Sequence, residues 1–128
     1  MTSNSIPDDV RRFIVNTVPS IPHLEAMLLL RDRRQPWPVA KVAERLYTTE
    51  QKARKLLSDL VRKGIARARE GDPDAFEYAP TPAQLGAVID GLARAYATHL
   101  VEITHLIHAK SANRAQRFAD AFKWREAG

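Results

Sequence analysis

The sequence predicts a mostly α-helical fold with one small β-hairpin. Apolar residues recur at helical spacing along most of the chain, and the period changes to alternation only between residues 65 and 79. The chain has 128 residues, of which 45% are hydrophobic and 27% are charged, so it can bury one core. This composition excludes a chain that is disordered throughout.

Two helices are expected before residue 35. The first covers about residues 7–17, because Ser5 and Pro7 form a helix start ahead of an apolar stripe. The second begins near Ser20, with Pro22 in its first turn. The residues expected to face the core are Val10, Phe13, Ile14, Leu24, Met27, Leu28 and Leu30.

The segment Pro36-Trp37-Pro38 is expected to be an extended connector, because proline fixes its own φ and disfavours helical geometry in the residue before it. We expect the indole of Trp37 to cover an edge of the core. A third helix then follows over residues 39–46. Its apolar side carries Val39, Val42, Ala43 and Leu46.

The strongest helix signal covers residues 49–63. Thr48 and Gln51 form a capping-box pair at its start, and Gly64 is the expected stop after a basic last turn. The apolar stripe of this helix consists of Ala53, Leu56, Leu57, Leu60 and Val61. Its opposite face carries Gln51, Lys55, Ser58 and Arg62, flanked by Lys52, Arg54 and Asp59.

The remaining chain is expected to form a hairpin and then two helices. Residues 65–69 and 76–79 alternate as strands do, and residues 70–74 between them are rich in turn formers. A long helix is expected from Pro82 to about Ala109. After a break at residues 110–113, a short helix places its apolar residues on one face, namely Ala115, Phe118, Ala119 and Phe122.

Basic residues are clustered in the middle of the chain. The whole chain has 20 Lys or Arg against 15 Asp or Glu, a net charge of +5. Between Arg31 and Arg69 there are twelve basic and four acidic side chains, a net charge of +8. Such a segment suits a polyanionic partner, but a solvated protein face has the same composition. The charge alone leaves both interpretations open.

Several classes of protein are excluded by the sequence. The chain has no cysteine, which rules out disulfides, thiolate zinc sites and cysteine catalysis. The longest apolar run, residues 26–30, is too short to cross a bilayer, and residues 1–4 lack the pattern of an export signal. We therefore expect a cytoplasmic protein without a membrane partner. Because phosphate loops, zinc-protease pairs and nucleophile elbows are also missing, we expect no catalytic activity and no cofactor.

The order of helix, short extended piece, helix, tight turn at Tyr47-Thr48, basic helix and hairpin is that of the winged helix-turn-helix. Residues 42–46 and 53–65 resemble the small-residue and leucine pattern of bacterial winged-helix transcription regulators in the broad MarR-like class. Ala43 corresponds to the small residue that lets the two motif helices approach each other. Gly64-Ile65 corresponds to the entry into the wing.

The resemblance covers residues 20–80 and implies binding of double-stranded DNA, with helix 49–63 in the major groove. By this correspondence the side chains that reach the bases are Gln51, Lys52 and Lys55. Those nearer the phosphates are Thr48, Thr49, Arg54, Ser58 and Arg62, and the strand arginines that contact the backbone are Arg67 and Arg69.

The two arms outside the winged core, residues 1–19 and 81–128, have different expected roles. The first is an N-terminal helical arm. The second resembles the helices that make two-fold dimers in such regulators, so we expect a homodimer. The side chains expected to form the dimer contact are Leu85, Ile89, Leu92, Tyr96, Leu100 and Ile103.

The hairpin tip departs from the DNA-binding pattern because it is acidic. Glu70, Asp72, Asp74 and Glu77 would be repelled by phosphate. Winged helices also serve as protein-interaction modules, so the alternative function is a regulatory adaptor that contacts a protein partner through the acidic wing or the terminal helices.

A polar stripe of His99, Glu102, His105 and His108 lies on the expected long helix. Neighbours at i, i+3 can share a metal ion, and imidazole with carboxylate suits zinc. The stripe drifts round the helix, however, so the four side chains cannot converge on one ion. We therefore expect a polar face, with no metal site.

Overall fold

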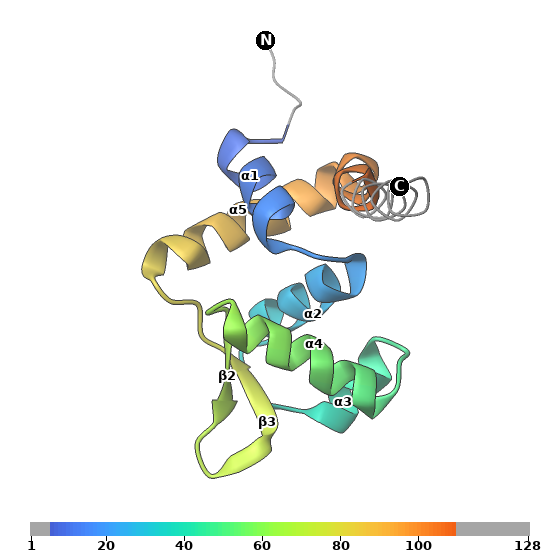
Figure 1. Cartoon of the computed structure of the whole chain (residues 1–128). Coiled ribbons are helices and arrows are strands. Elements are labelled where there is room, and N and C mark those ends of the chain that lie inside the picture. Colours follow the sequence, from blue (N-terminus) through green and yellow to red (C-terminus); the bar gives the residue numbers. More distant parts are fainter. Residues whose placement is uncertain (1–5, 110–128) are drawn as a thin grey trace, which may run out of the picture.

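The structure of the chain, a computed structural model, describes residues 6–109. It is mostly helical with a small antiparallel sheet, which confirms the predicted class at this level (Figure 1). In chain order the elements are α1 (Asp8–Thr17), α2 (Ile21–Asp32), β1 (Trp37–Pro38), α3 (Val39–Arg45), α4 (Glu50–Arg62), β2 (Ala66–Arg69), β3 (Asp72–Tyr78), α5 (Ala83–Thr98) and the helix Leu100–Ala109. The sheet lies at one end of the molecule and α1 and α5 lie at the other, with α2 and α4 between them.

The first two helices begin as the sequence predicts. Pro7 precedes α1, and Asp8 and Asp9 in the first turn interact favourably with the helix dipole. Ser20 caps α2 by accepting a hydrogen bond from the backbone N–H of His23, with an Oγ to N distance of 3.3 Å. The residues expected to face the core are buried in both helices, except that Leu28 is half-buried.

Helix α4 begins one residue later than predicted, so the Thr48–Gln51 capping pair is wrong. The cap is Thr49, whose Oγ1 accepts from the backbone N–H of Lys52 at 3.1 Å. The N–H of Thr48 instead donates to the carbonyl of Ala43 at 2.9 Å, which keeps Thr48 in the turn. The predicted stop is confirmed, since Gly64 has φ +79° immediately after the helix.

The sheet has one more strand than the sequence predicts, and a shorter turn. Trp37 in β1 pairs with Phe76, so the extended connector is an edge strand in the order β1-β3-β2. The expected turn over residues 70–74 is wrong because β3 already begins at Asp72, which lies opposite Arg69. An irregularity in the register follows Ala68. A register irregularity of this kind accommodates extra residues in one strand, here β3. The turn formers among these residues led to the prediction of a longer turn.

One core joins the helical arms to the central helices. Leu24 of α2, Leu57 of α4 and Ile89 of α5 are fully buried and belong to the same apolar cluster. Helix α1 packs on α5. Gly91 allows this close approach, because a Cβ there would lie 3.1 Å from Cγ2 of Val10.

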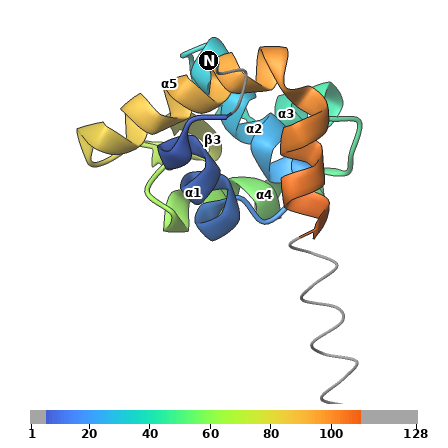
Figure 2. The same cartoon turned by 90° about the horizontal axis from the view of Figure 1, so that it is seen from above.

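The single long helix expected from Pro82 to Ala109 is wrong. Helix α5 ends at Thr98, and His99 has non-helical backbone angles of φ −128° and ψ 40°. The helix Leu100–Ala109 then turns away from the line of α5 (Figure 2). The turn brings Ile103 and Ile107 into the core, where their exposed fractions are 0% and 1%. Burial of these two side chains therefore accounts for the break.

Two further expectations concern the ends of the chain and membranes. The predicted break at residues 110–113 and the short helix after it lie outside the described residues, as does Ser5. Within residues 6–109 no single helix has both the length and the apolar composition needed to cross a membrane. Helices α1 and α2 meet both criteria only when they are taken together, and this pair is bent by 118°.

Candidate nucleic-acid interface

Helix α4 separates an apolar face from a basic face. Four of its five predicted apolar residues are buried, and they are Ala53, Leu56, Leu57 and Leu60. Val61 is 38% exposed, so its predicted place in the core is wrong. The exposed side chains on the other face are Gln51, Lys52, Arg54, Lys55 and Arg62, and Ser58 is half-buried among them. The predicted base-contacting and phosphate-contacting residues of this helix therefore share one accessible surface.

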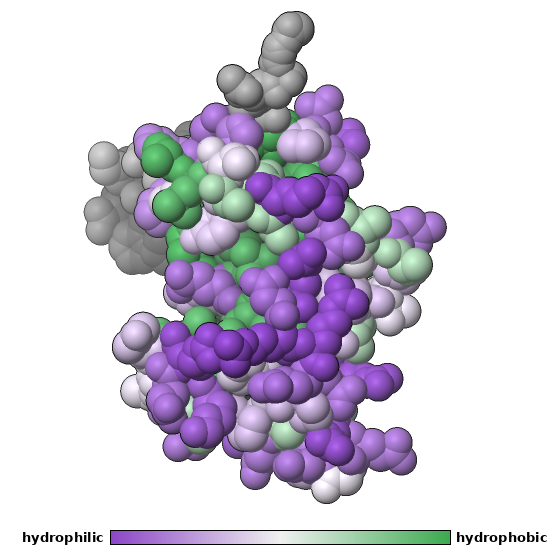
Figure 3. Space-filling view, turned by 180° about the vertical axis from the view of Figure 1, so that it is seen from behind, coloured by the Kyte–Doolittle hydropathy of each residue, from purple (hydrophilic) through white to green (hydrophobic). Residues whose placement is uncertain are grey.

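Polar and apolar residues also separate on the face of the molecule that lies behind the view of Figure 1. Figure 3, which views the side opposite to Figure 1, shows hydrophilic residues gathered over the half that carries the sheet. Apolar residues gather over the half that carries α1 and α5. On this face the hydrophilic residues therefore lie toward the hairpin and the apolar residues toward the helical arms.

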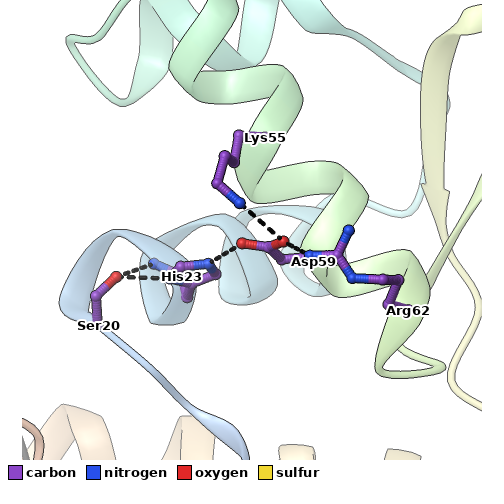
Figure 4. A network of polar contacts seen from close by, with 5 residues as sticks. All are labelled: Ser20, His23, Lys55, Asp59 and Arg62. Carbon is purple, nitrogen blue, oxygen red and sulfur yellow. Dashed lines mark hydrogen bonds and ion pairs between the residues drawn. The ribbon is translucent and has the colours of Figure 1, made fainter. Parts of the chain in front are cut away.

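A hydrogen-bonded network ties α4 to α2 (Figure 4). The Nε2 atom of His23 lies 2.8 Å from Oδ2 of Asp59, and its Nδ1 atom lies 2.6 Å from Oγ of Ser20. A carboxylate only accepts hydrogen bonds, so Nε2–H donates to Asp59. In neutral His23 the Nδ1 atom then accepts from the Ser20 hydroxyl. The Ser20 oxygen in turn accepts the backbone N–H of His23, and this chain of contacts fixes the imidazole.

Asp59 also orients two basic side chains of the exposed face. Its Oδ1 atom pairs with Lys55 at 3.6 Å, and the same atom accepts from Arg62. The hydrogen bond from His23 lowers the pKa of Asp59; burial opposes this, and Lys55 and Arg62 add to the lowering. The side chain of Asp59 is only 12% exposed. It therefore lies at the edge of the polar face, as expected, but its carboxylate is nearly buried against α2.

Local sequence signals predict only part of this network. Lys55, Asp59 and Arg62 have the i, i+4 and i, i+3 spacings that indicate ion pairs on one helix. His23, however, lies 36 residues before Asp59 in the sequence, and its only local signal is the cap formed with Ser20. A contact between two helices at this separation requires the packed structure.

The wing neutralises part of the basic surface. Arg54 of α4 pairs with Asp74 of β3 at 2.8 Å, and Arg67 pairs across the hairpin with Glu77 at 3.1 Å. All four side chains remain at least 27% exposed, so solvent weakens both pairs. Arg69 is exposed on the same strand. The acidic wing thus contacts α4 directly, and Arg54 is available to a polyanion only after it exchanges its carboxylate partner.

A cleft of about 760 Å³ opens between the start of α2, the turn before α4 and the first half of α4. The polar residues on its α4 side include Gln51, Lys52 and Lys55. Tyr47 lies on its rim with 96% of its side chain exposed, and Tyr47 has φ +55°. The left-handed conformation costs a residue with a Cβ about 1–2 kcal/mol. Tyr47 was expected in a tight turn, and no role was predicted for its side chain.

The expected dimer residues do not form one accessible surface. Ile89, Leu92 and Ile103 are fully buried within the chain, and Leu85 and Tyr96 are half-buried. The accessible apolar side chains in this region are Leu100, 52% exposed, and its neighbour Val101, 69% exposed. Side chains already buried in the core of one chain are not available to bind a second copy.

The His99 stripe lies at the break and on the helix that follows it. Glu102, His105 and His108 are exposed, and Nδ1 of His99 lies 2.8 Å from the hydroxyl of Thr98. Among residues 6–109 no three His, Cys, Asp or Glu side chains are arranged to hold a metal ion.

Comparison with protein-family models, curated proteins and solved structures finds no match to this chain. The case for a function therefore depends on the residues that the surface itself presents. Within residues 6–109, the exposed basic face of α4 and the adjoining cleft bring together most of the predicted binding residues.

Proposed function

We propose that the protein is a DNA-binding transcription regulator with a winged helix-turn-helix fold. The order α2-β1-α3-α4-β2-β3 is the helix, strand and hairpin order of that fold. The three antiparallel strands support the same assignment, since the extended connector pairs with the second strand of the hairpin. In such a fold the helix after the tight turn enters the major groove of duplex DNA.

The exposed basic face of α4 is the observation that carries this proposal. Gln51, Lys52 and Lys55 lie in the first half of the helix, where base contacts are made. Gln can form two hydrogen bonds with adenine, and Lys can donate to guanine. The hydrogen bond between Asp59 and His23 ties α4 to α2, which supports one orientation of this face relative to the rest of the fold.

The phosphate contacts would come from the edges of the same surface. Arg62 lies at the end of α4, and Arg54 faces the wing. On binding, a phosphate would replace Asp74 as the partner of Arg54. The strand residue Arg69 extends this basic edge along β2.

We also propose that the regulator is a homodimer, in which Leu100 and Val101 supply the contact. Both are exposed apolar side chains on the helix that follows the break at His99. A two-fold dimer would place two copies of α4 on successive major grooves of a palindromic site.

A protein-interaction module is the second candidate, and the wing favours it. Glu70 and Asp72 are exposed at the hairpin, and the exposed Asp74 neutralises Arg54. An acidic wing of this kind suits a basic protein surface better than a phosphate backbone.

The two functions are separated by equilibrium binding to a labelled duplex of mixed sequence across a salt series. For DNA binding, log affinity falls linearly with log salt, with a slope of about 0.9 per neutralised phosphate. Absence of binding at low salt by the folded protein would favour the interaction module.

A further inference from the structure

Tyr47 has a backbone conformation that its side chain does not explain. It has φ +55°, and among residues 6–109 it is the one residue other than glycine with a positive φ. Glycine adopts this conformation without a steric penalty, whereas a residue with a Cβ does not. A tyrosine is therefore an unfavourable choice for the turn itself.

No contact within the described part of the chain compensates for this choice. The turn is held by backbone bonds, from Tyr47 N–H to the carbonyl of Glu44 at 3.3 Å and from Thr48 N–H to that of Ala43 at 2.9 Å. A glycine would make both bonds equally well. Tyr47 as a whole is 96% exposed, so burial does not stabilise its side chain either. Its side chain is thus suited to a contact with another molecule.

The position of Tyr47 indicates the kind of molecule. The residue lies immediately before the start of α4, on the rim of the cleft that Lys52 and Thr49 also line. In the proposed complex this end of α4 is inserted between the two phosphate backbones of the major groove. A side chain in the preceding turn then lies beside a backbone and away from the base edges.

We propose that Tyr47 contacts the sugar-phosphate backbone of duplex DNA, an inference that rests on the proposed function. The phenol hydroxyl would donate to a phosphate oxygen, a contact that tyrosine commonly makes with DNA. The ring would lie against deoxyribose, and Lys52 would supply the positive charge nearby. Tyr47 is neutral, so its contact releases no counterions.

The test measures duplex affinity of Tyr47→Phe and Tyr47→Gly across a salt series. Removal of the hydroxyl is expected to weaken binding about 3- to 10-fold on every sequence. The salt slope is expected to stay at the wild-type value, whereas Arg54→Gln, which removes a proposed phosphate contact, is expected to lower it by about 0.9. Tyr47→Gly is expected to weaken binding further while raising Tm by about 2–4 °C, because it relieves the left-handed strain.

Tyr78→Phe is the matched control, because Tyr78 lines the cleft beside α5 and its buried hydroxyl has no hydrogen-bond partner within residues 6–109. It is expected to leave DNA affinity unchanged. If the wild type binds DNA and both Tyr47 variants bind it equally well, this inference is wrong and the proposed function stands. If the folded wild type binds no DNA, both are wrong.

Discussion

His23 on α2 donates a hydrogen bond of 2.8 Å to Asp59 on α4, and each side chain is only 12% exposed. This bond connects α2, whose start lines the cleft, with α4, which carries the basic surface. Asp59 also pairs with Lys55 and Arg62, so one buried carboxylate links the packing of α4 to the arrangement of its cations. The stability of the fold and the arrangement of the basic face therefore both depend on Asp59.

Replacement of Asp59 by Asn is expected to destabilise the fold by about 1–3 kcal/mol. The amide removes a charge-assisted bond from His23 and weakens the pairing with two cations. Chemical denaturation measures the loss. Asp32→Asn is the control, because Asp32 is 60% exposed in its pair with Arg31 and its loss should change stability by less than about 1 kcal/mol. Equal effects of the two variants would contradict the structural role of Asp59.

The lowered pKa of Asp59 predicts how stability depends on pH. A carboxyl whose pKa is lower in the folded state stabilises the fold above its unfolded pKa, about 3.9, and loses this contribution as pH falls through the folded value. The stability difference between wild type and Asp59→Asn should therefore be largest near neutral pH and shrink below about pH 4. Denaturation curves at a series of pH values check this, and a difference that stays constant down to pH 2 would contradict it.

The pair between Arg54 and Asp74 predicts that the wing restrains DNA binding. Asp74→Asn is expected to strengthen DNA affinity a few-fold at low salt, because it frees Arg54 and removes a negative charge near phosphate. The effect should fade as salt screens the charges. Asp72→Asn makes the same change in net charge but leaves the pair between Arg54 and Asp74 in place, so it measures the effect of charge alone. If neither variant changes affinity at any salt concentration, the wing does not approach the duplex, and the interaction module becomes the better account.

The exposed pair Leu100 and Val101 predicts the dimer contact. Replacing both by Asp is expected to convert the dimer into a folded monomer, because neither side chain supports the core. Leu92→Asp is the contrasting variant and should unfold the chain, since Leu92 is fully buried. Analytical ultracentrifugation and circular dichroism distinguish the two results. A wild type that sediments as a monomer at micromolar concentration would show that no such dimer forms.

Local signals predicted most of the helices and the hairpin. Three of these signals depend only on residues that are close in sequence, and the structure follows them. They are the cap at Ser20, the stop at Gly64 and the apolar spacing of α4. The failures involve competition with distant residues. The break at His99 occurs because Ile103 and Ile107 are buried in the core, although the sequence around them has a continuous helical period.

The candidate site shows the same limit. The basic face of α4 follows from its helical period, and so the exposure of Gln51, Lys52, Arg54, Lys55 and Arg62 was predicted correctly. The contacts of Asp59 with His23 and of Arg54 with Asp74 cross between elements and require the packed structure. Tyr47 was missed because hydrophobic patterns do not reveal backbone strain in a turn.

The most direct test of the central claim is the salt dependence of duplex binding by two matched double variants. Arg54→Gln with Arg62→Gln removes the two α4 charges that the proposal places on phosphates, and Arg11→Gln with Arg12→Gln removes two charges from α1, at the end of the molecule away from the sheet. If α4 binds DNA, the first variant should weaken binding and lower the slope of log affinity against log salt by up to about 1.8, while the second keeps the wild-type slope. Equal slopes for the two variants, or no binding by the folded wild type at low salt, would contradict a role of α4 in binding DNA.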